Sequence, residues 1–166
     1  MKREKAVRIL CFMLLFAMLA PALAGCGRKG AGTVYEDNMR SYASVIETLP
    51  EDSYYAFADM SKEHDALLVT DHVFDNLDGT FAAVEATVYG FDKEGRIREY
   101  GQVKSGGSAN PLAAKDSELY CAHHRYIDIV HIDEAASEMI TAESDDFEAY
   151  GDTVVIAFTP VSDKAG

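Results

Sequence analysis

The strongest constraint on the fold is a change of pattern after residue 50, where the chain becomes a series of short apolar runs separated by turn-forming residues. The first well-defined runs lie at 66–74, 80–91 and 96–103. The segments 76–79 (NLDG) and 92–95 (DKEG) separate them, and the glycine that closes each segment suits a left-handed backbone position. This alternation predicts two β-hairpins, and hence an antiparallel sheet.

The same pattern continues towards the end of the chain. A loop rich in Gly, Ser and Pro is expected at 105–111, followed by apolar runs at 119–122, 126–132 and 153–158. Together these runs predict a meander of about six or seven strands. The segment 133–141 fits two structures, because Glu, Ala and Met favour a helix whereas a strand would continue the meander. We expect a strand there.

Residues 35–49 have the spacing of an amphipathic helix. Apolar side chains recur at Tyr35, Met39, Tyr42, Ile46 and Leu49, and Pro50 ends the run. The expected fold class is therefore α+β, with this N-terminal helix packed on the antiparallel β-meander. Residues 35–160 have the length of a single domain, and 161–166 are expected to form a C-terminal tail.

The first 25 residues have the parts of an export signal in the usual order. Four basic side chains come first, at Lys2, Arg3, Lys5 and Arg8, and residues 9–20 are uncharged and apolar. This run is too short to cross a hydrocarbon core of ~30 Å, which takes roughly 20 helical residues. We expect residues 1–25 to be a signal peptide that is removed.

The signal ends in the string Leu23, Ala24, Gly25 and Cys26, which resembles the lipobox of bacterial lipoproteins. The resemblance implies cleavage between Gly25 and Cys26 and a diacylglyceryl group on the Cys26 sulfur. It also implies a protein held at the extracytoplasmic face of the cell membrane through its lipid, followed by a flexible tether over 26–34. The alternative is an ordinary signal peptide cut after Ala24 or Gly25.

A second resemblance covers roughly residues 42–132. The segments YYAFADM, HDALLV, VYGFDKEG and EYGQVKSGG are similar to strands and hairpins of uncharacterised surface lipoproteins of Firmicutes. Related sequences often carry an Asp-rich turn that implies calcium. Here the turn that starts at Asp59 lacks the glycine, and Thr70 stands where an EF-hand loop would need its bidentate Glu.

The chain is strongly acidic. Residues 1–25 hold four of its 15 basic and one of its 28 acidic side chains, which leaves 11 basic and 27 acidic side chains and a net charge of about −16 in the remaining chain. Such a charge excludes nucleic acid as a natural partner, because nucleic-acid binding depends on Lys and Arg. Cationic partners, divalent ions or simple solubility remain open.

We expect no metal site and no cofactor. The histidines His123, His124 and His131 lie in one run, but His123 and His131 would be about 26 Å apart along a continuous strand. A zinc site would need His64 or His72 from another strand. After processing, Cys121 is the one thiol that remains, so no internal disulfide is expected, and its apolar neighbours predict burial.

No catalytic motif is present: the chain lacks a nucleophile elbow, a phosphate loop, a dinucleotide fingerprint and an HExxH helix. The expected function is therefore that of a membrane-anchored binding or interaction module. The alternatives are a small extracytoplasmic hydrolase and an accessory subunit of an envelope complex.

Overall fold

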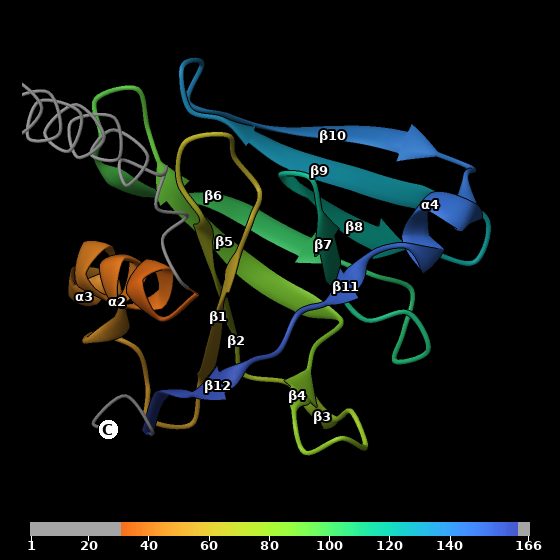
Figure 1. The fold of residues 1–166 in the computed structure, drawn as a ribbon, viewed down its shortest axis with the longest axis horizontal. Coiled ribbons are helices and arrows are strands. Elements are labelled where there is room, and N and C mark those ends of the chain that lie inside the picture. The colour runs from red at the N-terminus through yellow and green to blue at the C-terminus, as the bar shows by residue number, and fades with distance from the viewer. Residues whose placement is uncertain (1–30, 163–166) are drawn as a thin grey trace, which may run out of the picture. The chain divides into compact units, whose positions relative to one another are not determined.

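Two five-stranded antiparallel sheets form most of the structure, a computed structural model that describes residues 31–162. The first sheet has the strand order β12-β1-β2-β5-β6 (Figure 1). Its strands are β1 (Tyr54–Ala58), β2 (Ala66–Thr70), β5 (Glu85–Phe91), β6 (Ile97–Lys104) and β12 (Thr159–Pro160). Strand β12 is therefore the edge strand beside β1, although the two strands are about 100 residues apart in the sequence.

The second sheet has the strand order β10-β9-β8-β7-β11. Its strands are β7 (Ala113–Lys115), β8 (Glu118–Ala122), β9 (Ile127–Asp133), β10 (Glu138–Ser144) and β11 (Val154–Val155). A small third sheet is the hairpin of β3 (Phe74–Asp75) and β4 (Phe81–Ala82). The short helix α4 (Phe147–Gly151) follows β10, and Asp146 caps it by accepting from the N–H groups of Glu148 and Ala149.

The prediction of an α+β fold, with one helix over 35–49 packed on a single meander, is wrong. The structure is mostly β, and its strands form three antiparallel sheets. The stretch expected to form the helix is interrupted by a turn at Tyr42, which separates α2 (Ala31–Ser41) from the single-turn α3 (Ala43–Ile46). The apolar spacing matched one helix because spacing alone does not report such an interruption.

Several predictions from the N-terminal sequence lie outside the described residues. The signal peptide over 1–25, its cleavage site and the lipid attachment at Cys26 all precede residue 31. Helix α2 begins at Ala31, four residues before the start expected from the apolar spacing. Among residues 31–162, no helix combines the length and the apolar character needed to cross a membrane.

The local turn predictions are present in the structure. Gly79 and Gly95 both have a positive φ, at 87° and 72°, and they close the β3–β4 and β5–β6 hairpins. The segment 133–141, which fitted either a strand or a helix, contains a turn and then the start of β10. Short-range turn chemistry therefore determined these features.

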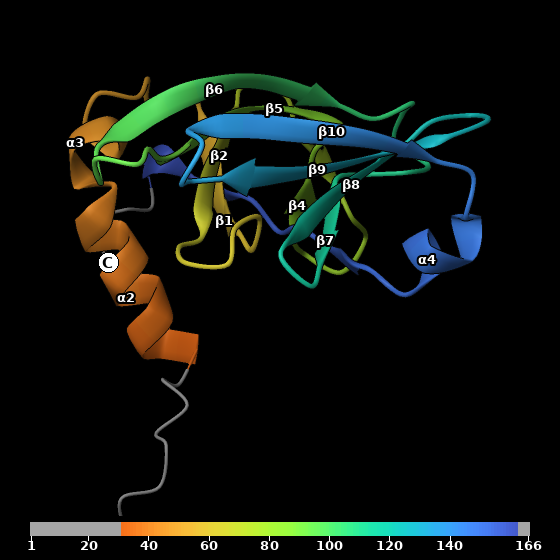
Figure 2. The ribbon, with the colours of Figure 1, turned by 90° about the horizontal axis from the view of Figure 1, so that it is seen from above.

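The two large sheets share one apolar core. The first sheet contributes several alanines to it, at Ala56, Ala58, Ala66 and Ala86, together with Leu68, Val88 and Val103, and the second sheet contributes Leu119, Cys121, Val130 and Ile132. Figure 2 shows β6 beside β10, where Met139 packs against this core. The opposite face of the first sheet buries a second cluster that includes Tyr55 and Leu67. Both faces of β1 and β2 are therefore covered.

Gly90 allows the two sheets to approach closely. A Cβ atom at this position would lie 2.6 Å from Ile132 Cδ1 and 3.1 Å from Tyr100 Cε2. The tip of Ile132 can rotate away, but Tyr100 is held because its hydroxyl donates to the Phe91 carbonyl at 2.7 Å. A side chain here would push β5 away from β9.

We expect Gly90→Ala to lower the free energy of unfolding by about 1–3 kcal/mol, the usual cost of overpacking a core. Urea denaturation monitored by circular dichroism measures the change. Gly151→Ala is the matched control, since its Cβ would meet nothing within 4 Å, and should change stability by less than about 0.5 kcal/mol. Equal effects of both substitutions would contradict the close approach of the sheets.

The β5–β6 turn is held by one carboxylate. Asp92 accepts hydrogen bonds from the backbone N–H groups of Arg96 and Glu94, each at 2.9 Å, and from the Arg96 guanidinium at 2.9 and 3.1 Å. The bond from the Arg96 backbone is the largest cause that lowers the pKa of Asp92 below its ordinary value of 3.8, and the guanidinium adds to it. The ionised form is therefore favoured by folding.

The contribution of Asp92 to stability should be complete above pH 3.8 and should disappear as the pH falls through the lowered pKa of the folded state. We expect Asp92→Asn to flatten the loss of unfolding free energy between about pH 5 and pH 2. Asp145→Asn, at an exposed position, is the control. An unchanged acid slope in Asp92→Asn would show that the turn carboxylate is not stabilised in this way.

Candidate functional site

A pocket of about 420 Å³ lies where the loop after β1 meets the turn after β9. Its wall combines Met60, Ser61 and Glu63 from the first segment with Ile132, Asp133 and Glu134 from the second. The two segments come from different sheets, so the pocket forms at a junction between the sheets. A concave pocket with a few convergent polar groups is a candidate binding site.

Backbone bonds fix the geometry of this junction. The Ile132 N–H donates to the Met60 carbonyl at 2.7 Å, which joins the loop after β1 to strand β9. On the neighbouring wall, the Ser117 N–H donates to the Asp59 carboxylate at 3.2 Å. The loop that carries Ser61, Glu63 and His64 is therefore attached at its start to the second sheet.

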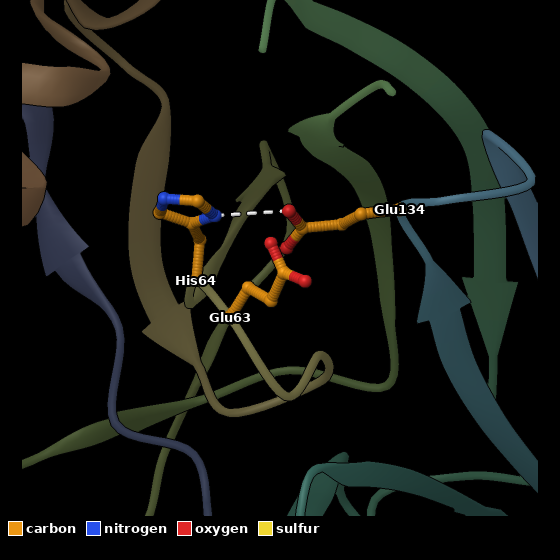
Figure 3. A group of neighbouring side chains, drawn as sticks. All are labelled: Glu63, His64 and Glu134. Carbon is orange, nitrogen blue, oxygen red and sulfur yellow. Dashed lines mark hydrogen bonds and ion pairs between the residues drawn. The ribbon is translucent and has the colours of Figure 1, made fainter. Parts of the chain in front are cut away.

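Glu134 is the centre of the site. Its side chain is only 9% exposed, whereas that of His64 is 51% exposed. The Ser61 hydroxyl donates to Glu134 Oε1, and His64 Nδ1 lies 2.9 Å from Glu134 Oε2 (Figure 3). Within residues 31–162, no Lys or Arg forms an ion pair with this buried carboxylate. Its polar partners in this part of the structure are a hydroxyl and an imidazole.

Glu63 completes a group of three donors. One ligand atom each from Glu63, His64 and Glu134 lies within 4.8 Å of the other two. Figure 3 shows the Glu63 carboxylate beside that of Glu134, and the His64 ring facing the Glu134 carboxylate. The exposed Glu63 and the half-exposed His64 therefore meet the nearly buried Glu134, which lies about 70 residues away in the sequence.

The arrangement of Ser61, His64 and Glu134 differs from that of a hydrolytic triad. In a triad the imidazole accepts the serine proton, and the acid orients the imidazole. Here the Ser61 hydroxyl donates to Glu134, so the imidazole does not activate it. The residue types of a serine hydrolase are present, but the geometry gives no nucleophile.

The structure separates the other histidines considered from the sequence. His131 lines the pocket, whereas His123 pairs with Asp128 at 3.2 Å and stacks on Tyr126. His72 pairs with the neighbouring Asp71. Neither His123 nor His72 joins the donor group. The sequence suggested His64 only as a possible partner of other histidines, and no sequence pattern links Glu63 and His64 with Glu134.

Cys121 is buried, as predicted, and lies within the shared core. Burial is the main reason that its pKa is raised to about 12, and the negative charge of Asp128 adds to the shift. The thiolate is the reactive form of cysteine, so the folded protein holds this side chain in an unreactive state.

Iodoacetamide at pH 8 should therefore label Cys121 at least about 100-fold more slowly in the native protein than in urea. Peptide mapping by mass spectrometry separates this site from Cys11 and Cys26. Labelling at similar rates in both conditions would contradict the burial of Cys121.

Comparisons with protein-family models, with curated proteins and with solved structures find no match for this chain.

Proposed function

We propose that this protein is an extracytoplasmic lipoprotein, anchored to the cell membrane through a diacylglyceryl group on Cys26, and that its β domain is a binding module. Support for the anchor comes from the sequence: a basic head, an apolar run and the string Leu23 to Cys26 stand in the order of a lipoprotein signal. Two acyl chains hold a protein stably at a membrane, so anchoring requires no protein surface.

The observation that carries the binding role is the pocket at the junction of the sheets. The Ile132 to Met60 bond joins its two walls, and its volume suits a small ligand. The Ser61 hydroxyl is committed to Glu134, so the same geometry gives no support to hydrolysis by a serine nucleophile. Binding without covalent chemistry is the role that these contacts favour.

The lining of the pocket indicates the charge of the ligand. Five carboxylates line it, against one lysine and one histidine: Glu63, Asp116, Glu118, Asp133 and Glu134, with Lys62 and His131. Together with the net charge of −13 for the whole chain, this lining favours a cation and opposes nucleic acid. The ligand that fits best is small and positively charged.

Intact mass spectrometry of protein extracted from the membranes of its own host tests the anchor. We expect a chain that begins at Cys26 and carries the added mass of a diacylglyceryl group. Cys26→Ala should abolish the lipid and release the protein from the membrane fraction, whereas the matched control Cys11→Ala should leave both unchanged. A soluble, unmodified chain with another N-terminus would contradict the proposal.

A further inference from the structure

We infer that Glu63, His64 and Glu134 bind one divalent transition-metal ion of the zinc class. This inference deepens the proposed binding role by naming the ligand class, and it does not depend on the lipid anchor. It goes beyond the sequence, in which no metal-binding motif joins these residues.

The donor types select the metal. The site offers one imidazole nitrogen, from His64, and two carboxylate groups, from Glu63 and Glu134. Zinc takes nitrogen and carboxylate oxygen together, whereas calcium and magnesium take oxygen ligands. A mixed set of this kind therefore favours zinc over the alkaline-earth ions.

The distances are close to those that zinc needs. Ligand atoms ~2.0–2.1 Å from a tetrahedral zinc ion stand about 3.3 Å from each other. His64 Nδ1 and Glu134 Oε2 are already 2.9 Å apart, and the whole donor group lies within 4.8 Å. Two donors need to separate by only a few tenths of an ångström. The exposed Glu63 side chain can rotate to supply the third donor.

Charge provides a second, independent argument. Glu134 is nearly buried, and its partners among residues 31–162 are the Ser61 hydroxyl and the His64 imidazole, with no Lys or Arg beside it. A buried carboxylate is stable when it is paired or when it coordinates a metal. A dication between Glu134 and Glu63 would neutralise both carboxylates, in a pocket that already favours cations.

The remaining contacts fit this assignment. The Ser61 hydroxyl donates to Glu134 Oε1 and thereby turns Oε2 towards His64, as hydrogen bonds to metal-binding side chains commonly orient them. The pocket on the open side leaves room for a further ligand such as water. On binding, the metal replaces the proton shared by Nδ1 and Oε2. A charged ring releases that proton to solvent and keeps the other one on Nε2, whereas a neutral ring moves its single proton from Nδ1 to Nε2.

Zinc binding to the full-length protein, purified from membranes in a non-ionic detergent without a polyhistidine tag, tests the inference. After treatment with EDTA, the protein is dialysed against ZnCl₂, and bound zinc is measured by elemental mass spectrometry. We expect one zinc ion per chain. His64→Ala should weaken binding by roughly 10-fold or more, since even the loss of a side chain that only hydrogen-bonds a metal ligand costs roughly 10–100-fold.

His72→Ala is the matched control, because His72 is also an exposed histidine paired with a carboxylate but has no third donor. It should leave zinc binding unchanged. Glu63→Gln alters an exposed side chain that the fold does not require, and it should also weaken binding. Bound cobalt(II) should show a tetrahedral absorption spectrum that is lost in His64→Ala.

The inference would be overturned if no zinc bound at a ratio of one, or if His64→Ala and His72→Ala had equal effects. The mass of the same purified sample reports the lipid on Cys26. An anchored protein without zinc would refute the metal site alone, and a zinc-binding protein without lipid would refute the anchor alone.

Discussion

The packing of two sheets across one alanine-rich core is the constraint on which the rest of the structure depends. Ala56, Ala58 and Ala86 present little bulk from the first sheet, and Gly90 presents none. The second sheet can therefore approach until Ile132 fits over Gly90. Close-packed interiors resist even single added methyl groups, so this approach fixes the position of β9 relative to β5.

The candidate site is a direct consequence of that position. Strand β9 comes near enough for the Ile132 N–H to reach the Met60 carbonyl, and the turn that follows places Glu134 at the junction. A carboxylate in such a place needs compensation, because burial opposes its charge. Ser61 and His64 supply hydrogen bonds, and the proposed metal ion would add positive charge.

The sequence predicted the parts of the fold that depend on local chemistry. The glycines at 79 and 95 identified two hairpins, because only a few residue types tolerate a positive φ. The division into two sheets was not predictable, since the apolar runs are similar to one another and β12 pairs with β1 about 100 residues away. The helix over 35–49 was predicted wrongly because apolar spacing does not reveal the turn at Tyr42.

The site was missed for the same physical reason. Glu63 and His64 are adjacent in sequence, but Glu134 is 70 residues from His64, and only the sheet packing brings them together. The sequence does place acidic residues around both segments, with Glu63 and Asp65 beside His64 and Asp133 beside Glu134. In a chain with 28 acidic side chains, however, that signal does not distinguish a ligand from a solvated carboxylate.

Amide hydrogen exchange of Ile132, followed by NMR in the metal-free protein, tests most directly whether the junction that frames the site is preassembled. We expect this amide to exchange as slowly as those of the central strand β2, because its bond to Met60 is part of the sheet packing. Exchange as fast as that of an exposed turn would show that the junction opens by itself. The donor group of Glu63, His64 and Glu134 would then not be held in place before a ligand arrives.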